Sequence, residues 1–386
     1  MRIGLVVPGF SADANDWCIP ALRNLVGQLA SVVDLHVFTL RYPGRPARYE
    51  LFGARITALG GGEARGLGSA GVWRRTASAL AAEHRAHPFD VLHAFWAGEP
   101  GFVTALMGRV LHIPTVISLA GGELARLRDI DYGGLLRRAE RMKTRLALRL
   151  ARVVTAGSAP TIESATSWLG SRPPWRMRRI PLGVDLGMFA PAEVRPGDRL
   201  PRLLNVASLS RVKDQATLLR AATLLRERGY AFELEITGSG PLQGELRSMA
   251  GRLELDSIVR WRGEIVHDRL PREYQRAQVF VLSSRHEAQS MVALEAAACG
   301  LPVVGTRVGV LAELAPAAAR VAPVGDAQGL ADAIAGLLDD EPSRIRSGQT
   351  ARTRAVAEYG LELCATTFHN LYLEVASGDA MTLDAS

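Results

Sequence analysis

Two glutamates eight residues apart, Glu287 and Glu295, are candidates to bind hydroxyl groups of a ligand in this chain of 386 residues. An apolar run, Val279–Leu282, precedes them and predicts a buried strand. Ser290 can cap the N-terminus of the helix that follows, and Gly300 can end it. Glu287 is therefore expected in a strand-to-helix loop, where it can accept a hydrogen bond from a sugar hydroxyl. Glu295 is expected inside the helix, where it can accept hydrogen bonds from ribose hydroxyls.

The start of the same helix is a candidate anion site. The backbone amides of Ser290 and Met291 have no partners within the helix, and the helix dipole adds positive charge there. Lys213 offers a second source of charge. Only Lys143 and Lys213 among the 46 basic residues are lysines, so either a compact ammonium is needed at these positions or composition placed them by chance.

Strands that alternate with helices must position these groups, and this order predicts a doubly wound α/β fold. The first half contains predicted strands at 3–7, 34–39, 90–94, 115–119 and 152–156, with helices at 18–30, 71–87, 101–111 and 134–150. The second half contains predicted strands at 202–207, 232–237, 258–261, 279–282, 302–305 and 320–321, with helices at 216–228, 241–253, 270–275, 290–299 and 327–340. We therefore predict an N-terminal domain at 1–188, a Pro-rich linker at 189–201 and a second domain at 202–365. The segment 366–386 is predicted as a helix that packs back on the first domain, followed by a frayed tail.

The framed glutamates resemble the Glu-x7-Glu motif of the retaining glycosyltransferases of family 4, which have the GT-B fold. The frame is Ser-x-x-Glu before the motif and Glu-Ala-x-Ala-x-Gly-x-Pro-Val-Val after it. The resemblance extends to Leu209–Asp214, whose Lys213 corresponds to the family's phosphate-binding lysine. It also extends to Gly238, Ser239 and Gly240 near the nucleotide, to Arg262 and Gly263 near the base, and to Ile180–Asp185 at the end of the first domain.

Two departures from the family pattern stand beside these matches. Family members often carry an arginine where this chain has Ser208, and Arg211 is the candidate replacement for its charge. Many members also place a histidine beside the reacting sugar, where this chain has Ala120. The donor side is therefore identified on more residues than the acceptor side.

Three residues of the first half are candidates for the acceptor side because strand ends line ligand sites in such folds. His93 is an active-site residue or a structural histidine, and Trp96 stacks on an acceptor ring or only packs. Glu123, in a Gly-Gly-Glu loop, is expected to contact the acceptor. Asp129-Ile130-Asp131 is the only Asp-x-Asp sequence and lies outside the donor motifs, so we predict neither a metal nor another cofactor.

The segment Gly134–Val153 is a basic amphipathic helix in the prediction. Its apolar stripe consists of Leu135, Ala139, Met142, Leu146 and Leu150. This helix either packs that stripe on the core with a solvated basic face or touches an anionic membrane. The net charge of +7 favours anionic partners, but no aromatic-basic platform indicates nucleic acid. Three scattered cysteines, and the lack of a signal or membrane-spanning segment, predict a cytoplasmic protein, at most peripheral to the membrane.

The resemblance therefore implies a metal-independent, retaining glycosyltransferase that moves a sugar from a nucleotide-diphosphate sugar to a glycan, lipid-linked or small-molecule acceptor. Lys213, Arg211 and Glu287 are its expected catalytic residues, and closure of two domains across a cleft is expected. Two alternatives stay open, a nucleotide-sugar epimerase on the same fold and a catalytically silent nucleotide-sugar-binding protein. The donor base, the sugar and the acceptor are not specified by the sequence.

Overall fold

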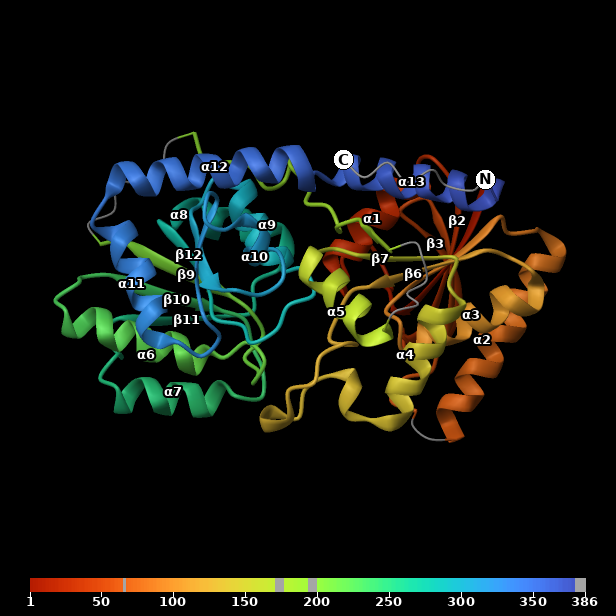
Figure 1. The fold of residues 1–386 in the computed structure, drawn as a ribbon, viewed down its shortest axis with the longest axis horizontal. Helices are drawn as coiled ribbons and strands as arrows, with labels where there is room; N and C mark the ends of the chain where they lie inside the picture. Colours follow the sequence, from red (N-terminus) through yellow and green to blue (C-terminus); the bar gives the residue numbers. More distant parts are fainter. Residues whose placement is uncertain (65–66, 171–176, 194–199, 379–386) are drawn as a thin grey trace. The chain divides into compact units, whose positions relative to one another are not determined.

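The apolar runs form two separate β-sheets in a computed structural model, which describes residues 1–64, 67–170, 177–193 and 200–378. Each sheet is the centre of one compact unit (Figure 1). Unit 1 comprises Met1–Gly183 together with Leu361–Ser386, and unit 2 comprises Val184–Gly360. The chain thus leaves unit 1 once and returns to it for its last helix.

Unit 1 contains a sheet of eight strands in the order β3-β4-β2-β1-β5-β6-β7-β8. Its strands are β1 (Arg2–Gly9), β2 (Asp34–Tyr42), β3 (Pro46–Leu51), β4 (Ala54–Leu59), β5 (Val91–Phe95), β6 (Thr115–Leu119), β7 (Val153–Ala156) and β8 (Met177–Arg179). Its helices are α1 (Pro20–Ala30), α2 (Leu67–Ala86), α3 (Glu99–Leu111), α4 (Arg138–Leu150), α5 (Ala159–Leu169) and α13 (Leu361–Ser377), with short 3₁₀ turns η1 (Arg128–Ile130) and η2 (Gly134–Leu136). All pairs are parallel except β3 with β4.

Alternate residues of the unit 1 strands enter two different cores. On one face, Ile3 and Leu5 of β1 pack with residues of α1 and α13 such as Phe368. On the other face, Val6 packs with residues of α2, α3, α4 and α5. Both faces are covered, which explains why the strands are continuous apolar runs.

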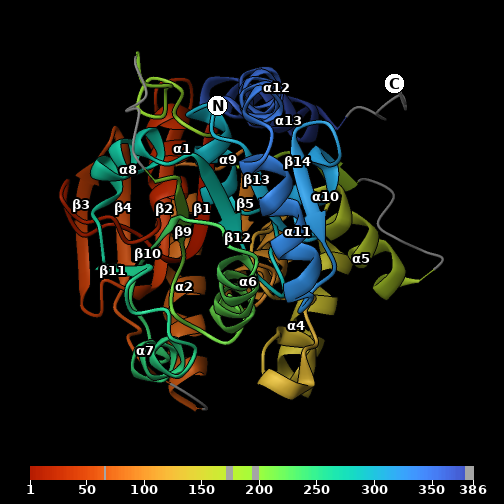
Figure 2. The ribbon, with the colours of Figure 1, turned by 90° about the vertical axis from the view of Figure 1, so that its left-hand side faces the viewer.

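Unit 2 contains a sheet of six parallel strands in the order β11-β10-β9-β12-β13-β14. Its strands are β9 (Arg202–Val206), β10 (Glu233–Thr237), β11 (Val259–Gly263), β12 (Val279–Leu282), β13 (Val303–Thr306) and β14 (Ala319–Ala322). Its helices are α6 (Gln215–Glu227), α7 (Gln243–Arg252), α8 (Leu270–Arg276), α9 (Met291–Ala298), α10 (Leu311–Leu314), α11 (Ala327–Leu338) and α12 (Glu341–Tyr359), and η3 (His267–Arg269) is a 3₁₀ turn. The helices α6 and α11 lie side by side against one face of this sheet (Figure 2). The opposite face packs on α8, α9, α10 and α12.

The unit boundaries differ from the domain boundaries expected at 188 and 365. Val184 already belongs to unit 2, where its amide donates to the carbonyl of Tyr359 at 2.8 Å. Phe189, expected in a linker, is 1% exposed in the unit 2 core and contacts the ring of Tyr274. The remaining part of the expected linker, 194–199, lies outside the described residues, as does the expected frayed tail from 379 onward.

The basic segment 134–153 also differs from its prediction. The helix α4 is shorter, and it buries Thr144, Ala147 and Leu148 rather than the expected apolar stripe. Three members of that stripe are exposed: Ala139, Met142 at 72% and Leu146 at 37%. The prediction failed because small residues let α4 lie close to α3, where Ala147 approaches Gly101. Among the helices that the structure describes, none has the length and apolar character needed to cross a membrane.

Candidate active site at the carboxyl edge of unit 2

An ion pair joins two residues that are 74 positions apart in the sequence. Lys213 Nζ lies 2.6 Å from Glu287 Oε1, and Ser284 donates its hydroxyl to the same oxygen at 2.6 Å. Lys213 follows β9 and Glu287 follows β12, the two neighbouring strands at which the strand order of the sheet reverses. Ligands of doubly wound sheets bind at this point, outside the carboxyl ends of the strands. The sequence-predicted Lys213 and Glu287 therefore meet where a ligand is expected.

Backbone contacts hold the two loops of this pair together. The amide of Arg285 donates to the carbonyl of Val212 at 2.7 Å, and the hydroxyl of Ser283 donates to the carbonyl of Lys213 at 2.8 Å. Asp214 caps α6 through a side-chain hydrogen bond from the amide of Thr217. These bonds fix the backbone on either side of Lys213, so the base of the Lys213 side chain has a defined position.

The N-terminus of α9 lies next in the chain after Glu287. Ser290 is its cap residue, with φ 82° and ψ 80°, a backbone conformation that is rare for a residue with a side chain. Ser290 is 5% exposed, and its hydroxyl oxygen has no hydrogen-bond partner among the described residues. Such strained residues cluster at ligand sites. The first amides of α9 and this hydroxyl supply donors of the kind that bind phosphate oxygens.

Glu295 lies within α9 and points toward the interior of unit 2. Its two carboxylate oxygens accept hydrogen bonds from His267 Nε2 at 2.9 Å and from the Tyr274 hydroxyl at 2.8 Å. Glu295 is 4% exposed, and burial beside its carboxylate raises the pKa of Tyr274 well above the ordinary value. Each carboxylate oxygen retains a second lone pair. Sequence reasoning missed His267 and Tyr274, because no local pattern links them to Glu295.

The glycine-rich loop closes the other side of the same sheet edge. The amide of Gly238 donates to the carbonyl of Gly263 at 2.7 Å, and the amide of Leu209 donates to the carbonyl of Ser239 at 2.8 Å. At Gly238, whose φ is 130°, a Cβ atom would lie 2.0 Å from the carbonyl oxygen of Ala207, so only glycine fits. At Gly240 a Cβ atom would lie 2.5 Å from the carbonyl oxygen of Leu209. The loops after β9, β10 and β11 thus form one continuous backbone surface.

The remaining predicted donor residues lie on or beside this surface. Ser208 and Arg211 are both exposed in the loop after β9, and the hydroxyl groups of Ser208 and Ser210 are 3.2 Å apart. Ser239 contacts Glu264 through its hydroxyl, and Arg262 is exposed at the end of β11. Arg211 therefore has the freedom to approach a ligand, which is compatible with its predicted role in place of Ser208.

His93 is buried in unit 1 and offers no surface to a ligand. It is 0% exposed, and its ring nitrogens lie 2.7 Å from the Tyr372 hydroxyl and 2.7 Å from Ser118 Oγ. Burial lowers the pKa of His93 to about 3, so its ring is neutral at physiological pH. Two roles were predicted for His93, in the active site or in the structure. The structure supports the structural role, because α13, a distant part of the chain, covers the ring.

Glu123 is likewise held inside unit 1. Its carboxylate accepts hydrogen bonds from the backbone amides of Ala97, Ala120 and Gly121, and the residue is 8% exposed. Burial raises the pKa of Glu123 above its ordinary value, although those amides oppose the shift. The expected contact between Glu123 and an acceptor is thus replaced by a role in shaping the loops after β5 and β6.

Trp96 remains half-buried at the carboxyl end of β5, beside the point where the strand order of unit 1 reverses. Its φ of 68° is unusual for a bulky residue.

Asp129 and Asp131 lie at η1 of unit 1, in a different unit from the donor residues. The described ranges contain no group of three or more His, Cys, Asp or Glu side chains that could hold a metal ion.

Comparisons with known proteins identify the family and the fold of this chain. Residues 190–354 match the family described as glycosyl transferases group 1, and residues 21–187 match glycosyltransferase family 4. Two doubly wound units with these matches define the GT-B fold. The chain belongs to glycosyltransferase family 4.

Individual relatives extend the comparison. A D-inositol 3-phosphate glycosyltransferase of Pseudarthrobacter chlorophenolicus is 36% identical over 196 residues, which are 47% of this chain and 46% of the relative. The chain thus spans about half the length of this curated relative. Sucrose-phosphate synthase from Thermosynechococcus elongatus shares the fold with a TM-score of 0.80 at 22% identity, covering 98% of this chain and 100% of that one. HepE of Anabaena in complex with UDP-glucose has a TM-score of 0.74 at 17% identity, covering 97% and 100%.

Proposed function

We propose that this protein is a retaining hexosyltransferase that binds a nucleotide-diphosphate sugar at the carboxyl edge of unit 2. The observation that carries the proposal is the Lys213–Glu287 ion pair beside the N-terminus of α9. A cation, a carboxylate and the amides at a helix N-terminus, all at one strand-order reversal, match the charges and hydroxyls of such a donor. The neighbour HepE, which binds UDP-glucose, supports this class of ligand.

Donor binding exchanges the ion pair for contacts with the ligand. The ammonium of Lys213 turns to the phosphate nearest the sugar, and Glu287 accepts hydrogen bonds from sugar hydroxyls. The amides of Ser290 and Met291 bind the same diphosphate. Glu295, held by His267 and Tyr274, uses its remaining lone pairs for the ribose hydroxyls.

The loops after β10 and β11 complete the donor site. Gly238, Ser239 and Gly240 let the backbone approach the nucleotide closely, since side chains at the two glycines would collide with the loop after β9. Arg262 and Gly263 lie at the end of β11, where they can contact the base. Ser208 leaves room for Arg211 to add its charge to that of Lys213.

Transfer then depends on stabilising the leaving nucleoside diphosphate. As the bond between the anomeric carbon and the phosphate oxygen breaks, negative charge grows on that oxygen, and Lys213, Arg211 and the amides of α9 oppose it. The leaving phosphate takes the proton of the acceptor hydroxyl on the same face, so the anomeric configuration is retained. No separate enzyme base is needed for this step.

The acceptor is a carbohydrate, a lipid-linked molecule or another small molecule with a reactive hydroxyl. Trp96 is our candidate for stacking on an acceptor ring, because it stands half-buried at the strand-order reversal of unit 1.

We further propose peripheral contact between an anionic membrane and the exposed arginines of 134–153, among them Arg138 and Arg141. Sedimentation with vesicles that contain phosphatidylglycerol tests this contact, and binding that is equal for neutral vesicles would refute it.

A panel of nucleotide sugars tests the donor proposal. The matching donor should raise the melting temperature, because ligand binding to the folded state stabilises it. The purified protein should also release nucleoside diphosphate slowly from that donor, and Glu287→Ala and Lys213→Ala should abolish the release. Arg228→Ala, which removes an ion pair with Asp332 at the far end of α6, is the matched control and should retain it.

The same experiment separates the alternatives. A donor that shifts the melting temperature without any turnover, with or without candidate acceptors, would favour a silent binding protein. Conversion of the donor to its C2 epimer would favour an epimerase. If no nucleotide sugar shifts the melting temperature, the donor site is wrongly assigned.

A further inference from the structure

Unit 1 contains a large cavity that none of the donor residues lines. It is an open groove of about 1050 Å³ between the start of α2, the start of α3 and the whole length of α4. All its walls come from unit 1, so the groove does not depend on how the two units are placed. Its volume is at the upper end of the range typical of small-molecule sites.

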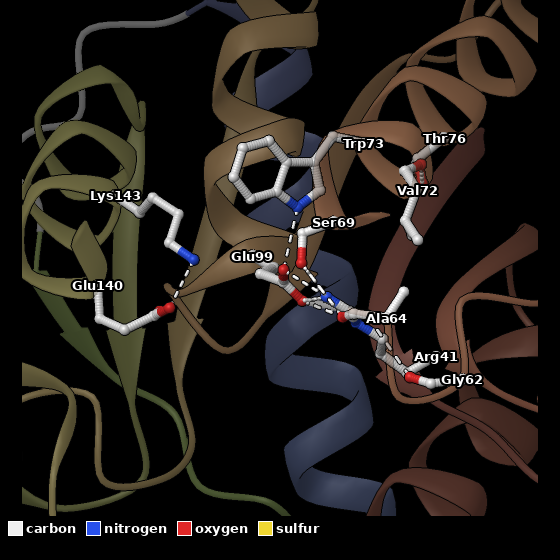
Figure 3. Close-up of polar contacts among 10 residues, drawn as sticks. All are labelled: Arg41, Gly62, Ala64, Ser69, Val72, Trp73, Thr76, Glu99, Glu140 and Lys143. Carbon is white, nitrogen blue, oxygen red and sulfur yellow. Dashed lines mark hydrogen bonds and ion pairs between the residues drawn. The ribbon is translucent and has the colours of Figure 1, made fainter. Parts of the chain in front are cut away.

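A network of polar contacts builds the floor of this groove (Figure 3). The guanidinium of Arg41 forms a two-pronged ion pair with Glu99, at 2.6 Å from Oε1 and 2.9 Å from Oε2. The same guanidinium donates to the Ser69 hydroxyl at 2.9 Å and to the carbonyl of Ala64. Arg41 therefore holds Ala64 and Ser69 against Glu99 at the start of α3.

Trp73 and Lys143 extend this network across the groove. Trp73 donates its ring N–H to Glu99 at 3.1 Å, and its ring packs edge-on against Phe102. The ammonium of Lys143 lies 5.2 Å from the centre of the Trp73 ring and 2.6 Å from Glu140 Oε1 (Figure 3). Lys143, one of only two lysines in the chain, thus connects α4 to α2.

The network also neutralises the acidic groups of the floor. Burial alone would raise the pKa of Glu99, but Arg41, Lys143 and Trp73 together outweigh burial and hold that pKa below its ordinary value. Glu99 and Glu140 are therefore paired carboxylates. The floor is built and satisfied without a ligand, so the groove is a formed site rather than a loose gap between helices.

The wall formed by α4 is apolar. Met142 is 72% exposed and Leu146 is 37% exposed, and both line the groove one helical turn apart. Leaving these side chains in water is unfavourable by about 25 cal/mol for each Å² of apolar surface. Together with Phe102 and Trp73 they form a strip that a hydrocarbon chain can cover.

Arginines flank this strip. Arg137, Arg145 and Arg149 line the groove, against a single further carboxylate, Glu63. Within the described residues, neither Arg137 nor Arg149 has an ion-pair partner, and Arg145 lies over the Trp168 ring at 5.7 Å. The helical rise places Arg137 and Arg149 about 18 Å apart along α4. An apolar strip with unpaired cations at its ends is complementary to a molecule with a hydrocarbon chain and an anionic head.

We propose that the groove between α2, α3 and α4 binds one molecule of a single-chain anionic amphiphile, with its chain on Met142 and Leu146 and its anionic head at Arg145 and Arg149. The site goes beyond the proposed transfer reaction and does not rest on it. Binding should be measurable without any nucleotide sugar, so failure of either proposal leaves the other testable.

Titration calorimetry of the full chain with dodecyl phosphate, kept below its micelle concentration, tests the site. We expect one molecule bound per chain. Dodecyltrimethylammonium, which has the same chain and the opposite charge, should bind at least about tenfold more weakly. Butyl phosphate, which has the same head and a short chain, should also bind at least about tenfold more weakly, because burial of each lost methylene contributes to affinity.

Four exposed positions of unit 1 give matched variants. Met142→Gln with Leu146→Gln should weaken dodecyl phosphate binding about tenfold or more, since both lose apolar contact. Arg145→Ala with Arg149→Ala should weaken it about fivefold or more, and the loss should shrink at high salt. The controls are Val110→Gln, which is 66% exposed on α3, and Arg109→Ala beside it on the same helix, and neither residue lines the groove.

Several outcomes would overturn the proposal. Equal binding of the cationic amphiphile would show a general apolar patch, and equal losses in the control variants would show that binding lies elsewhere. Binding to anionic vesicles without binding of monomeric dodecyl phosphate would show a planar membrane contact instead of a groove site. A dimer in solution that Met142→Gln with Leu146→Gln dissociates would identify a second copy of the chain as the occupant.

Discussion

Lys213 and Glu287 neutralise each other at 2.6 Å, although each is also the residue expected to touch a different part of the donor. Both side chains are only partly exposed, at 22% and 11%. The pair therefore keeps two charges in place until a ligand with a phosphate and hydroxyl groups replaces both partners. This arrangement makes the two residues separable by experiment.

The first prediction separates the phosphate contact from the sugar contact. Glu287→Gln frees the ammonium of Lys213 and retains a group that can bond Ser284, so nucleoside diphosphate should bind as tightly as before or more tightly. Lys213→Met should weaken it, and each variant should lower turnover by about 10²–10³ fold. Calorimetry with the nucleoside diphosphate and initial rates with the donor give the two readouts. Weaker diphosphate binding by Glu287→Gln would contradict these assignments.

The second prediction concerns Arg211 and Ser208. If Arg211 supplies the charge that family members take from an arginine at the position of Ser208, then Arg211→Ala should lower turnover about tenfold. Adding Ser208→Arg to Arg211→Ala should restore part of that loss, because Ser208 is exposed and has room for a longer side chain. Turnover measured for the two variants tests whether Arg211 supplies this charge. Unchanged activity in Arg211→Ala would exclude the replacement.

The third prediction tests the support of Glu295. Tyr274→Phe removes one hydrogen bond from a buried carboxylate, which should cost about 1–3 kcal/mol of folding free energy. If Glu295 binds the ribose, the KM for the donor should also rise more than kcat falls. Urea unfolding and donor titration measure the two effects. Tyr230→Phe, whose hydroxyl bonds the exposed Asp339, is the control and should change neither quantity. A stability loss with an unchanged KM would leave Glu295 as a purely structural residue.

The fourth prediction is a pH dependence of stability that arises in unit 1. Burial lowers the pKa of His93 to about 3 and that of His36 to about 4, from 6.5 in both cases. Below pH 6.5 the unfolded chain therefore takes up protons that the folded chain does not, so the free energy of unfolding should fall as the pH decreases toward 4. At pH 5, His93 alone should lower the free energy of unfolding by about 2 kcal/mol relative to neutral pH. His93→Gln should remove that part of the pH dependence. Urea unfolding at pH 7.5 and pH 5 provides the measurement, and an unchanged slope in the variant would contradict the burial argument.

The sequence by itself determined the features that depend on near neighbours in the chain. The apolar runs predicted most of the parallel strands, because a strand buried on both faces must be apolar throughout. The frame around Glu287 and Glu295 identified the strand, loop and helix that carry them, since capping and helix-ending residues act within a few positions. The hairpin of β3 and β4 was missed because its turn residues, Phe52 and Gly53, are not one of the pairs, such as Asn-Gly or Asp-Gly, that signal such a turn in a sequence, although both adopt positive φ in the structure.

Only the tertiary structure decided which residues meet. The strand order brings Lys213 to Glu287, and packing from outside α9 gives Glu295 its partners His267 and Tyr274. Burial of His93 depends on α13, which lies 279 positions away at Tyr372. The same reason applies to α4: periodicity identifies an apolar stripe, but close packing against α3 selects which face is buried. Local sequence encodes the conformation of each segment, whereas the partners of a side chain follow from how distant segments pack.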